Sequence, residues 1–270
     1  MASKYSQISV HSILLLGTLL ILAPIWIIFA SSTHDSYTIA TKGMQFGIGD
    51  QFLNNYQNVL FERSGFSKEI TFVGLLFNSL VMAFGIATLT VVTSLLAAYT
   101  IVYFKIRLAT TYFWLIFTTL LVPLEVRIFP SYAIVSELNL TNTYTGLILP
   151  LLASSIATFF FRQFYKTIPD ELLEAAKIDG ANSWKFFIDF LIPLSKTMII
   201  AIFIFMFVYG YNQYLWPILV TSSEEYWTVI MGMKIIRGSF SYIILSIIPP
   251  VLVVIFLQRW FVKGLLYSGK

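Results

Sequence analysis

The sequence has no cysteine, only two histidines and few charged residues. Without cysteine, a disulfide framework, a thiolate nucleophile and a cysteine-ligated metal site are all excluded. His11 and His34 lie far apart and do not have the spacing of metal ligands. Charged residues make up 11% of the chain, less than half of the roughly 25% that is usual in soluble globular domains. This low charge argues against a soluble fold.

Hydrophobic residues dominate what is present. They make up 58% of the 270 residues, and the mean hydropathy is +0.82. A soluble fold of this length could not bury so much apolar surface, so lipid is the expected solvent. The net charge of +4 is small, and no basic face or long basic run is present. A nucleic-acid partner is therefore not expected.

Six uncharged stretches predict six transmembrane helices, and so an all-α, polytopic membrane protein. Crossing the hydrocarbon core takes roughly 20 apolar helical residues, and every stretch meets or approaches that length. Helices are expected because lipid requires every backbone polar group to be paired inside the protein. The predicted spans are Tyr5–Thr33, Ile70–Phe104, Leu108–Leu124, Leu138–Phe161, Thr197–Ser223 and Gly238–Gln258.

The distribution of Lys and Arg predicts the direction of these spans. With the N-terminus inside, eleven of the 17 basic residues face the cytoplasm, including the short turn Lys105-Ile106-Arg107. Both termini are then cytoplasmic. The long connection Ser31–Glu69 lies outside, and the connection Arg162–Lys196 lies inside. We expect residues 1–270 to form a single transmembrane domain with its core at about 70–262.

The inner loop at 167–193 predicts two short helices joined by a glycine turn. Thr167 is a candidate N-cap, and Gly180 suits a left-handed C-cap. Asn182 or Ser183 can cap the second helix. The first helix presents small side chains at Ala175 and Ala176, which let another surface approach its backbone. It could fill a groove on a partner protein or rest on the membrane surface, and composition alone leaves both alternatives open.

A longer motif in this loop carries a resemblance to a known family. Glu174-Ala175-Ala176 is followed after three residues by Gly180 and after nine more by Phe190-Leu-Ile-Pro193. This pattern resembles the EAA loop of ABC importer permeases, although the family prefers Ile and Leu at positions 190 and 192. Across nearly the whole chain, the sequence resembles the carbohydrate-uptake branch of these permeases. Further segments that carry the resemblance are Asn78–Phe84, Val122–Pro130, Ala157–Phe164, Tyr209–Pro217 and Ile248–Pro250.

The resemblance implies the role of the loop and the partners of the chain. In the family, the loop forms a cytoplasmic coupling helix that docks in a cleft of an ATPase subunit. The resemblance assigns that role to Glu174, Ala175, Ala176, Asp179 and Gly180. It implies a second homologous permease, two ATPase subunits and an extracytoplasmic solute-binding protein, all at a bacterial inner membrane. ATP and Mg would bind the ATPase subunits, so this chain is expected to be a non-catalytic subunit without a cofactor.

Arg127 is the sharpest candidate for contact with a substrate. It lies between Pro123 and Pro130 at the outer end of the third predicted span, where we expect the helix to be broken. Charge near membrane depth is costly and usually functional, and arginine can hold two phosphate oxygens at once. Glu125 is close in sequence. The alternatives are an interfacial arginine that reaches to the membrane surface or an ion pair with Glu125 or Glu137.

A second candidate region combines amides and aromatic rings. Tyr211, Asn212, Gln213 and Tyr214 lie in the fifth predicted span, where amides need partners. They could line a polyol pocket or bond one helix to another, and Asn78 in the second span has the same two readings. The resemblance implies transport of sn-glycerol-3-phosphate or a related phosphorylated polyol, with a sugar or oligosaccharide as the alternative.

Two other classes of function are less well supported. An ion-coupled transporter often carries carboxylates within its spans, whereas these spans are almost free of Asp and Glu. An intramembrane enzyme would need a clustered acid–base set or a nucleophile with its base, and no such set is visible. The sequence therefore favours the permease.

Overall fold

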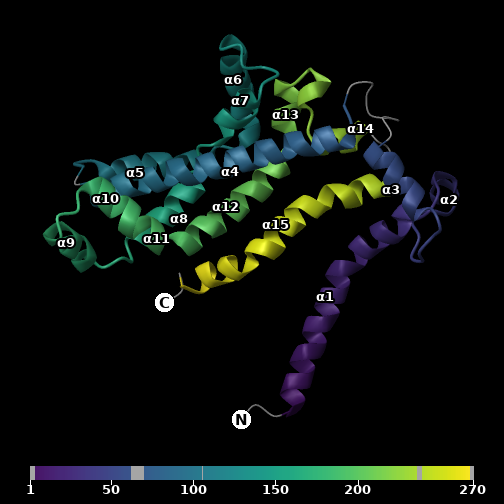
Figure 1. Cartoon of the computed structure of the whole chain (residues 1–270), viewed down its shortest axis with the longest axis horizontal. Helices are drawn as coiled ribbons and strands as arrows, with labels where there is room; N and C mark the ends of the chain where they lie inside the picture. Colours follow the sequence, from purple (N-terminus) through teal and green to yellow (C-terminus); the bar gives the residue numbers. More distant parts are fainter. Residues whose placement is uncertain (1–3, 62–69, 105, 236–238, 268–270) are drawn as a thin grey trace. The chain divides into compact units, whose positions relative to one another are not determined.

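The chain folds as helices throughout the part that can be described. The computed structural model describes residues 4–61, 70–104, 106–235 and 239–267, and every regular element within them is helical. Three helices are long and apolar enough to cross a membrane, or up to six spans if each bent pair counts as one. The predicted all-helical membrane fold is confirmed (Figure 1).

Two compact units make up the chain, one of residues 1–74 with 232–249 and one of residues 75–231 with 250–270. The first unit begins with α1 (Lys4–Ser32), which matches the first predicted span, and continues with α2 (Ser36–Lys42) and α3 (Phe52–Phe61). Only 6% of the apolar window of α1 is buried, as expected for a helix whose solvent is lipid.

Polar contacts within the first unit order the connection after α1. The Asn55 amide donates to the carbonyls of Ser32 (2.9 Å) and His34 (2.8 Å). The Tyr56 hydroxyl lies 2.8 Å from the hydroxyl of Ser32. These bonds satisfy the carbonyls that the end of α1 leaves free, so part of the predicted polar loop is a packed helical segment.

The second unit is organised along α4 (Phe72–Tyr103), most of which belongs to it. Two further long elements match predicted spans, since α4 covers the second and α15 (Phe240–Tyr267) covers and extends the sixth. The remaining helices are short. They are α5 (Ala109–Thr118), η1 (Thr119–Leu121), α6 (Leu124–Glu137), α7 (Tyr144–Ile148), η2 (Leu149–Leu151), α8 (Ser155–Tyr165), α9 (Asp170–Ile178), α10 (Ser183–Phe186), the π-helical turn η3 (Phe187–Leu191), α11 (Ile192–Leu194), α12 (Lys196–Tyr211), α13 (Leu215–Val220), η4 (Glu224–Tyr226) and α14 (Val229–Ile235).

The third predicted span is not one straight helix. It ends at η1, and the chain turns by 104° into α6. Val122 is extended, at φ −89° and ψ 109°, because a residue before proline is pushed out of the helical region. Pro123 itself occupies the N-cap position of α6, whereas Pro130 lies inside that helix. The helix is therefore broken on one side of Arg127 only.

The fourth and fifth predicted spans are also interrupted. Residues 138–143 form a turn in which Asn139 and Asn142 have positive φ, so the fourth helical stretch starts only at α7. A bend of 50° then separates η2 from α8. In the fifth stretch, α12 ends at Tyr211 and α13 follows after a short break, because Pro217 has no N–H to continue the helical ladder.

Close packing and hydrogen bonds join α4 to these interrupted helices. A Cβ at Gly210 on α12 would lie 3.2 Å from the Cα of Ala83 on α4, so the two backbones approach closely there. The Thr90 hydroxyl donates to the carbonyl of Leu152 (2.8 Å), at the break between η2 and α8. Buried carbonyls at helix breaks need such partners in lipid, and α4 supplies them.

Candidate coupling and translocation sites

The helix α9 contains the alanine pair of the loop motif and ends in a glycine turn. Gly180 has φ +76°. The amides of Gly180 and Ala181 donate to the carbonyls of Lys177 (3.0 Å) and Ala176 (2.9 Å), which is the Schellman pattern of a helix C-cap. A Cβ at Gly180 would meet no atom within 4 Å, so glycine is favoured by the backbone conformation and not by lack of space. The predicted left-handed cap is confirmed.

The beginning of α9 differs from the prediction. The Thr167 hydroxyl donates to the carbonyl of Phe164 (2.7 Å) and so completes the end of α8. Pro169 takes the N-cap position, with no side-chain hydrogen bond. The N-cap prediction for Thr167 is wrong because α9 begins at Asp170, so Thr167 lies two residues before the N-cap position. Asp170 and Glu171 occupy the first turn of α9, as the positive end of a helix favours.

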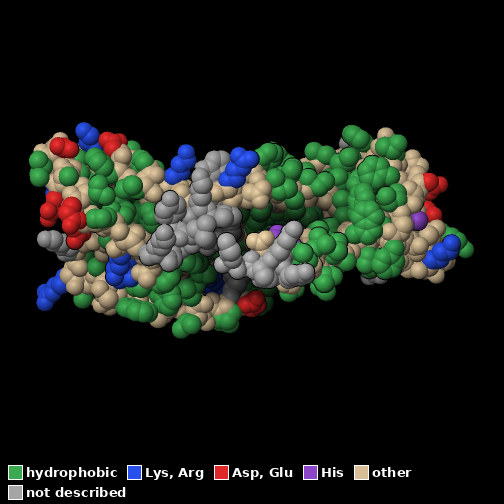
Figure 2. Space-filling view, turned by 90° about the horizontal axis from the view of Figure 1, so that it is seen from below, with side chains coloured by type: hydrophobic (Ala, Val, Ile, Leu, Met, Phe, Trp, Pro, Cys, Tyr) green, Lys and Arg blue, Asp and Glu red, His purple; other side chains and the backbone are tan. Residues whose placement is uncertain are grey.

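Most of the surface of α9 is exposed. The exposed residues include all but one of the five predicted coupling positions, namely Glu174, Ala175, Asp179 and Gly180. Ala176 is the exception, at 2% exposure, and it anchors the helix. Ile178 is 86% exposed although it is apolar. Figure 2 shows acidic and basic side chains gathered at the end of the molecule that α9 forms.

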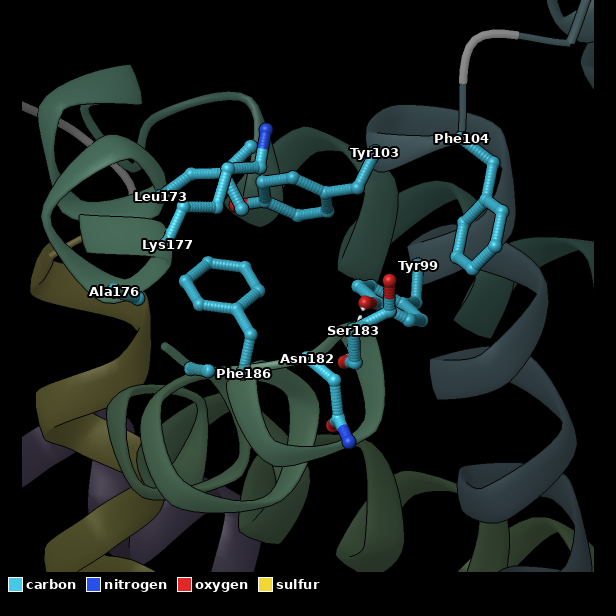
Figure 3. Close-up of a pocket in the computed structure, with 10 residues that line it drawn as sticks. Tyr99, Tyr103, Phe104, Leu173, Ala176, Lys177, Asn182, Ser183 and Phe186 are labelled. Carbon is cyan, nitrogen blue, oxygen red and sulfur yellow. Dashed lines mark hydrogen bonds between the residues drawn. The ribbon is translucent and has the colours of Figure 1, made fainter. Parts of the chain in front are cut away.

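A cavity of about 320 Å³ separates α9 from the end of α4. Figure 3 shows Leu173, Ala176 and Lys177 on α9 facing Tyr103 of α4 and Phe186 of α10. The rings of Tyr103 and Phe186 are 5.4 Å apart and meet edge to face. The helix therefore rests on a few aromatic contacts rather than on a filled core. The cavity is lined by Tyr99, Tyr103, Phe104, Leu173, Ala176, Lys177, Ala181, Asn182, Ser183 and Phe186.

The segment after α9 is tied firmly to α4. The Tyr99 hydroxyl donates to the carbonyl of Ser183 (2.7 Å), drawn as a dashed line in Figure 3. The Asn182 side chain accepts from the amide of Lys185 (2.8 Å) and caps α10, as predicted. Beyond α11 the chain bends by 74° into α12, and Pro193 lies at this bend as expected. The segment after α9 is therefore held at α4 by a hydrogen bond and continues through α11 into α12.

The substrate candidates on α6 and α12 lie next to two helix breaks. Glu125 and Arg127 are exposed on the first turns of α6, which follows the break at Pro123. Tyr209 lies near the end of α12, and Gln213 lies in the break that follows it. The Gln213 amide, in a side chain only 9% exposed, donates to the Tyr209 carbonyl (3.3 Å).

The other candidates on this segment differ in their surroundings. Tyr211 is 2% exposed, and its ring stacks on that of Phe207 at 6.1 Å. Tyr214 is half-buried at the start of α13, and Asn212 is exposed. Of these residues, Asn212 and Tyr214 are accessible to a solute in this conformation, whereas Tyr211 is part of the packing.

Asn78 is surrounded by protein partners. It is 3% exposed, its amide donates to the carbonyls of Glu225 (2.7 Å) and Trp227 (2.9 Å), and its oxygen accepts from the Tyr144 hydroxyl (2.6 Å). Of the two readings from sequence, this geometry favours a bond between segments over contact with a substrate.

Comparison with known proteins places the chain in a family. The family described as "Binding-protein-dependent transport system inner membrane component" matches residues 90–267. The chain belongs to this family. The matched stretch runs from the second half of α4 to the end of α15 and includes α9. The chain is thus an inner-membrane permease component of a transport system, and the predicted resemblance is confirmed.

Curated relatives of this permease cover almost its full length. Proteins named "sn-glycerol-3-phosphate transport system permease protein UgpE" are 45% identical in Yersinia enterocolitica, 44% in Rhizobium meliloti and 42% in Brucella melitensis, each over 96% of both chains. Among solved structures, a bacterial ABC transporter involved in alginate import matches with a TM-score of 0.75 over 97% of this chain and 99% of its own. At 22% identity, that likeness supports the fold.

Two features of this permease were not found from the sequence. Tyr209 was noted only as part of a motif, although its carbonyl accepts from the Gln213 amide. Asn142 has φ +55°, and its side-chain oxygen accepts from the amides of Ser222 (2.8 Å) and Ser223 (2.9 Å). An asparagine within a predicted span was the available signal, because asparagine tolerates positive φ better than most residues.

Proposed function

We propose that this permease forms half of the translocation pathway of an ATP-driven importer for sn-glycerol-3-phosphate or a related phosphorylated polyol. The observation that carries the proposal is α9, a capped and exposed helix that contains Glu174-Ala175-Ala176 and is tied through α10 to α4. The names of the curated relatives support the choice of solute.

In this proposal, α9 docks in a groove of a separate ATPase subunit. Glu174, Ala175, Asp179 and Gly180 contact the groove, Ile178 adds an apolar anchor at the tip, and Ala176 holds the helix on its own unit. ATP with Mg binds the ATPase subunits. When they close, the bond between Tyr99 and Ser183 and the bend before α12 carry the motion into the spans. A rigid helix seated in a moving partner is sufficient for this transmission.

The substrate contacts in the proposal lie where α6 meets the end of α12. Arg127 is the group for the phosphate, because guanidinium and phosphate form paired, charge-assisted hydrogen bonds. Tyr209, Gln213, Asn212 and Tyr214 offer hydroxyl and amide groups for the polyol. The negative charge of Glu125 on the same turn disfavours anions that do not engage Arg127 fully.

The assembly in this proposal contains one homologous permease, two ATPase subunits and an external solute-binding protein. It lies in a bacterial inner membrane with both termini of this chain in the cytoplasm. That direction puts α9 on the same side as ATP. It puts the segment between α13 and α14 on the side of the binding protein, since the fifth predicted span, which contains α12 and α13, then ends outside.

Reconstitution tests the proposal. The purified complex in liposomes should hydrolyse ATP faster when the binding protein is loaded with sn-glycerol-3-phosphate, and uptake should continue in the presence of a protonophore. A complex that responds to a neutral sugar and not to the phosphate would refute the solute. Uptake that stops with the protonophore and ignores ATP would refute the importer.

A further inference from the structure

Two helices of the second unit, α5 and α8, pack antiparallel through aromatic rings. The ring of Phe113 on α5 stacks on that of Phe159 on α8, with their centroids 6.2 Å apart. Just beyond α5, the Thr119 hydroxyl lies 2.6 Å from the hydroxyl of Ser155, the first residue of α8. Later residues on one side therefore meet earlier residues on the other, so the N-terminus of α5 and the C-terminus of α8 lie at the same end of the pair.

Arg162 lies in the last turn of α8 and contacts the packed ring of α5. Its Cζ atom is 3.8 Å from the centroid of the Phe113 ring, which is a cation–π contact. The Nε of Arg162 is buried and has no hydrogen-bond partner. Among the residues that the structure describes, no carboxylate forms an ion pair with this guanidinium. A positive charge near membrane depth is costly unless it is neutralised, so this position favours an anion.

Two further basic residues lie at the same end of the helix pair. Arg107 is exposed in the turn that precedes α5, and Lys166 is exposed at the C-cap of α8. We call Arg107, Arg162 and Lys166 the basic cluster. The acidic residues nearest to Arg162 in sequence, Asp170 and Glu171, belong to the next helix, α9. The basic cluster thus brings three positive charges to one end of α5 and α8.

The helix α5 exposes apolar and aromatic side chains next to the basic cluster. Tyr112, Trp114 and Leu115 are all exposed, on the turns that follow Arg107. Tyrosine and tryptophan are enriched where a membrane protein meets the lipid headgroups. Positive charges beside exposed apolar side chains match an amphipathic molecule with an anionic head. A soluble anion would use the charges and leave the apolar surface without a partner.

We propose that the basic cluster binds the phosphate of an anionic phospholipid, whose acyl chains lie along the exposed side of α5. The guanidinium of Arg162, held on the ring of Phe113, donates to the phosphate oxygens. Arg107 and Lys166 add favourable charge around the headgroup. The proposal is independent of the solute and of the importer function. The membrane direction proposed above puts the basic cluster on the cytoplasmic side.

The test uses the full-length permease with the subunits that co-purify with it, in a neutral detergent. The midpoint of thermal unfolding is measured against the concentration of added phosphatidylglycerol. We expect this lipid to raise the midpoint, whereas phosphatidylcholine and inorganic phosphate at equal concentration do not. Arg162→Gln should raise the half-saturating concentration of phosphatidylglycerol by about fivefold or more. Lys42→Gln is the matched control, because Lys42 is exposed at the end of α2 and its loss changes the net charge equally.

Each other outcome would overturn the proposal. These outcomes are no stabilisation of the wild type by phosphatidylglycerol, an unchanged half-saturating concentration in Arg162→Gln, and an equal rise in Lys42→Gln. Equal stabilisation by inorganic phosphate would indicate an anion site that does not need a lipid. Loss of a co-purifying subunit in Arg162→Gln, with unchanged lipid binding, would assign the basic cluster to a protein contact. If Arg162→Gln does not fold, Arg107→Gln decides, because Arg107 is exposed: a raised half-saturating concentration supports the lipid site and an unchanged one overturns it.

Discussion

A β-branched residue at position 180 would strain the turn that ends α9. The turn needs φ +76° at this position. A side chain there would meet no atom within 4 Å, so the effect comes from the backbone alone. A left-handed conformation costs a residue with a Cβ roughly 1–2 kcal/mol. That cost lowers the equilibrium constant for the native turn by a factor of about 5–30.

The consequence for transport follows from where the turn lies. Gly180 connects α9 to the segment that Tyr99 ties to α4, so a refolded turn would misdirect α9 relative to its partner groove. We expect Gly180→Val to lower the initial rate of uptake by about 5- to 30-fold, with a normal amount of the complex in the membrane. Gly180→Asn should retain most of the uptake, because asparagine adopts positive φ more readily than valine.

A matched control is available at Gly43. It also has φ +76°, a Cβ there would also meet no atom within 4 Å, and it ends the helix α2 in the connection after α1. The ψ of Gly43 is −162°, a region almost restricted to glycine, so Gly43→Val should cause at least as much local strain without loss of coupling. Uptake and ATP hydrolysis of all three variants are measured in the same liposomes. Normal uptake in Gly180→Val, or equal losses in Gly180→Val and Gly43→Val, would refute the coupling role of the turn.

Four further changes have defined outcomes. Ile178→Glu adds charge at the exposed tip of α9. It should therefore weaken co-purification of the ATPase subunit while the permease still reaches the membrane. Unchanged co-purification would contradict docking of the ATPase subunit at this tip. Arg127→Ala should raise the KM for a phosphorylated solute by about tenfold or more. Arg127→Lys should raise the KM by less, since lysine keeps the charge but not the paired hydrogen bonds. An equal KM in both variants and the wild type would exclude phosphate contact. Gly146→Ala should lower the thermal stability in detergent by about 1–3 kcal/mol, because the new Cβ would collide with a main-chain carbonyl. The hydrogen bonds from Thr38 hold the pKa of Asp35 below its usual value. The stabilisation from this cap of α2 is therefore present above the pKa of Asp35 in the unfolded chain and is lost as pH falls through its pKa in the folded chain. Amide exchange at Thr38 should rise below about pH 4, and Asp35→Asn should remove this dependence.

Much of the architecture was predictable because lipid imposes one rule on every span. The long apolar stretches of α1, α4 and α15 could only be helices, and their bounds agree with prediction to within a few residues at most ends. The Schellman cap at Gly180 was also predictable, since it depends on residues within one turn. Local chemistry suffices for features of this kind.

The interruptions of the other spans depended on different signals. The prolines around Arg127 predicted the break that appears as a bend of 104° before α6, whereas hydropathy averages over a window and does not register the turn at Asn139 and Asn142. Thr167 shows a limit on a smaller scale, because α9 begins three residues after it, with Pro169 at the N-cap position. Asn78 gained its surroundings from segments far away in sequence, which no local pattern contains.

The sequence by itself determined that this protein is a helical membrane permease with a glycine-capped helix at α9, because apolar length, caps and the EAA motif are local properties. Only the tertiary structure decided that Asn78 belongs to a hydrogen-bonded node and that the Gln213 amide bonds back to the carbonyl of Tyr209. The physical reason is that a buried polar group must find a partner, and which partner it finds depends on how distant helices pack.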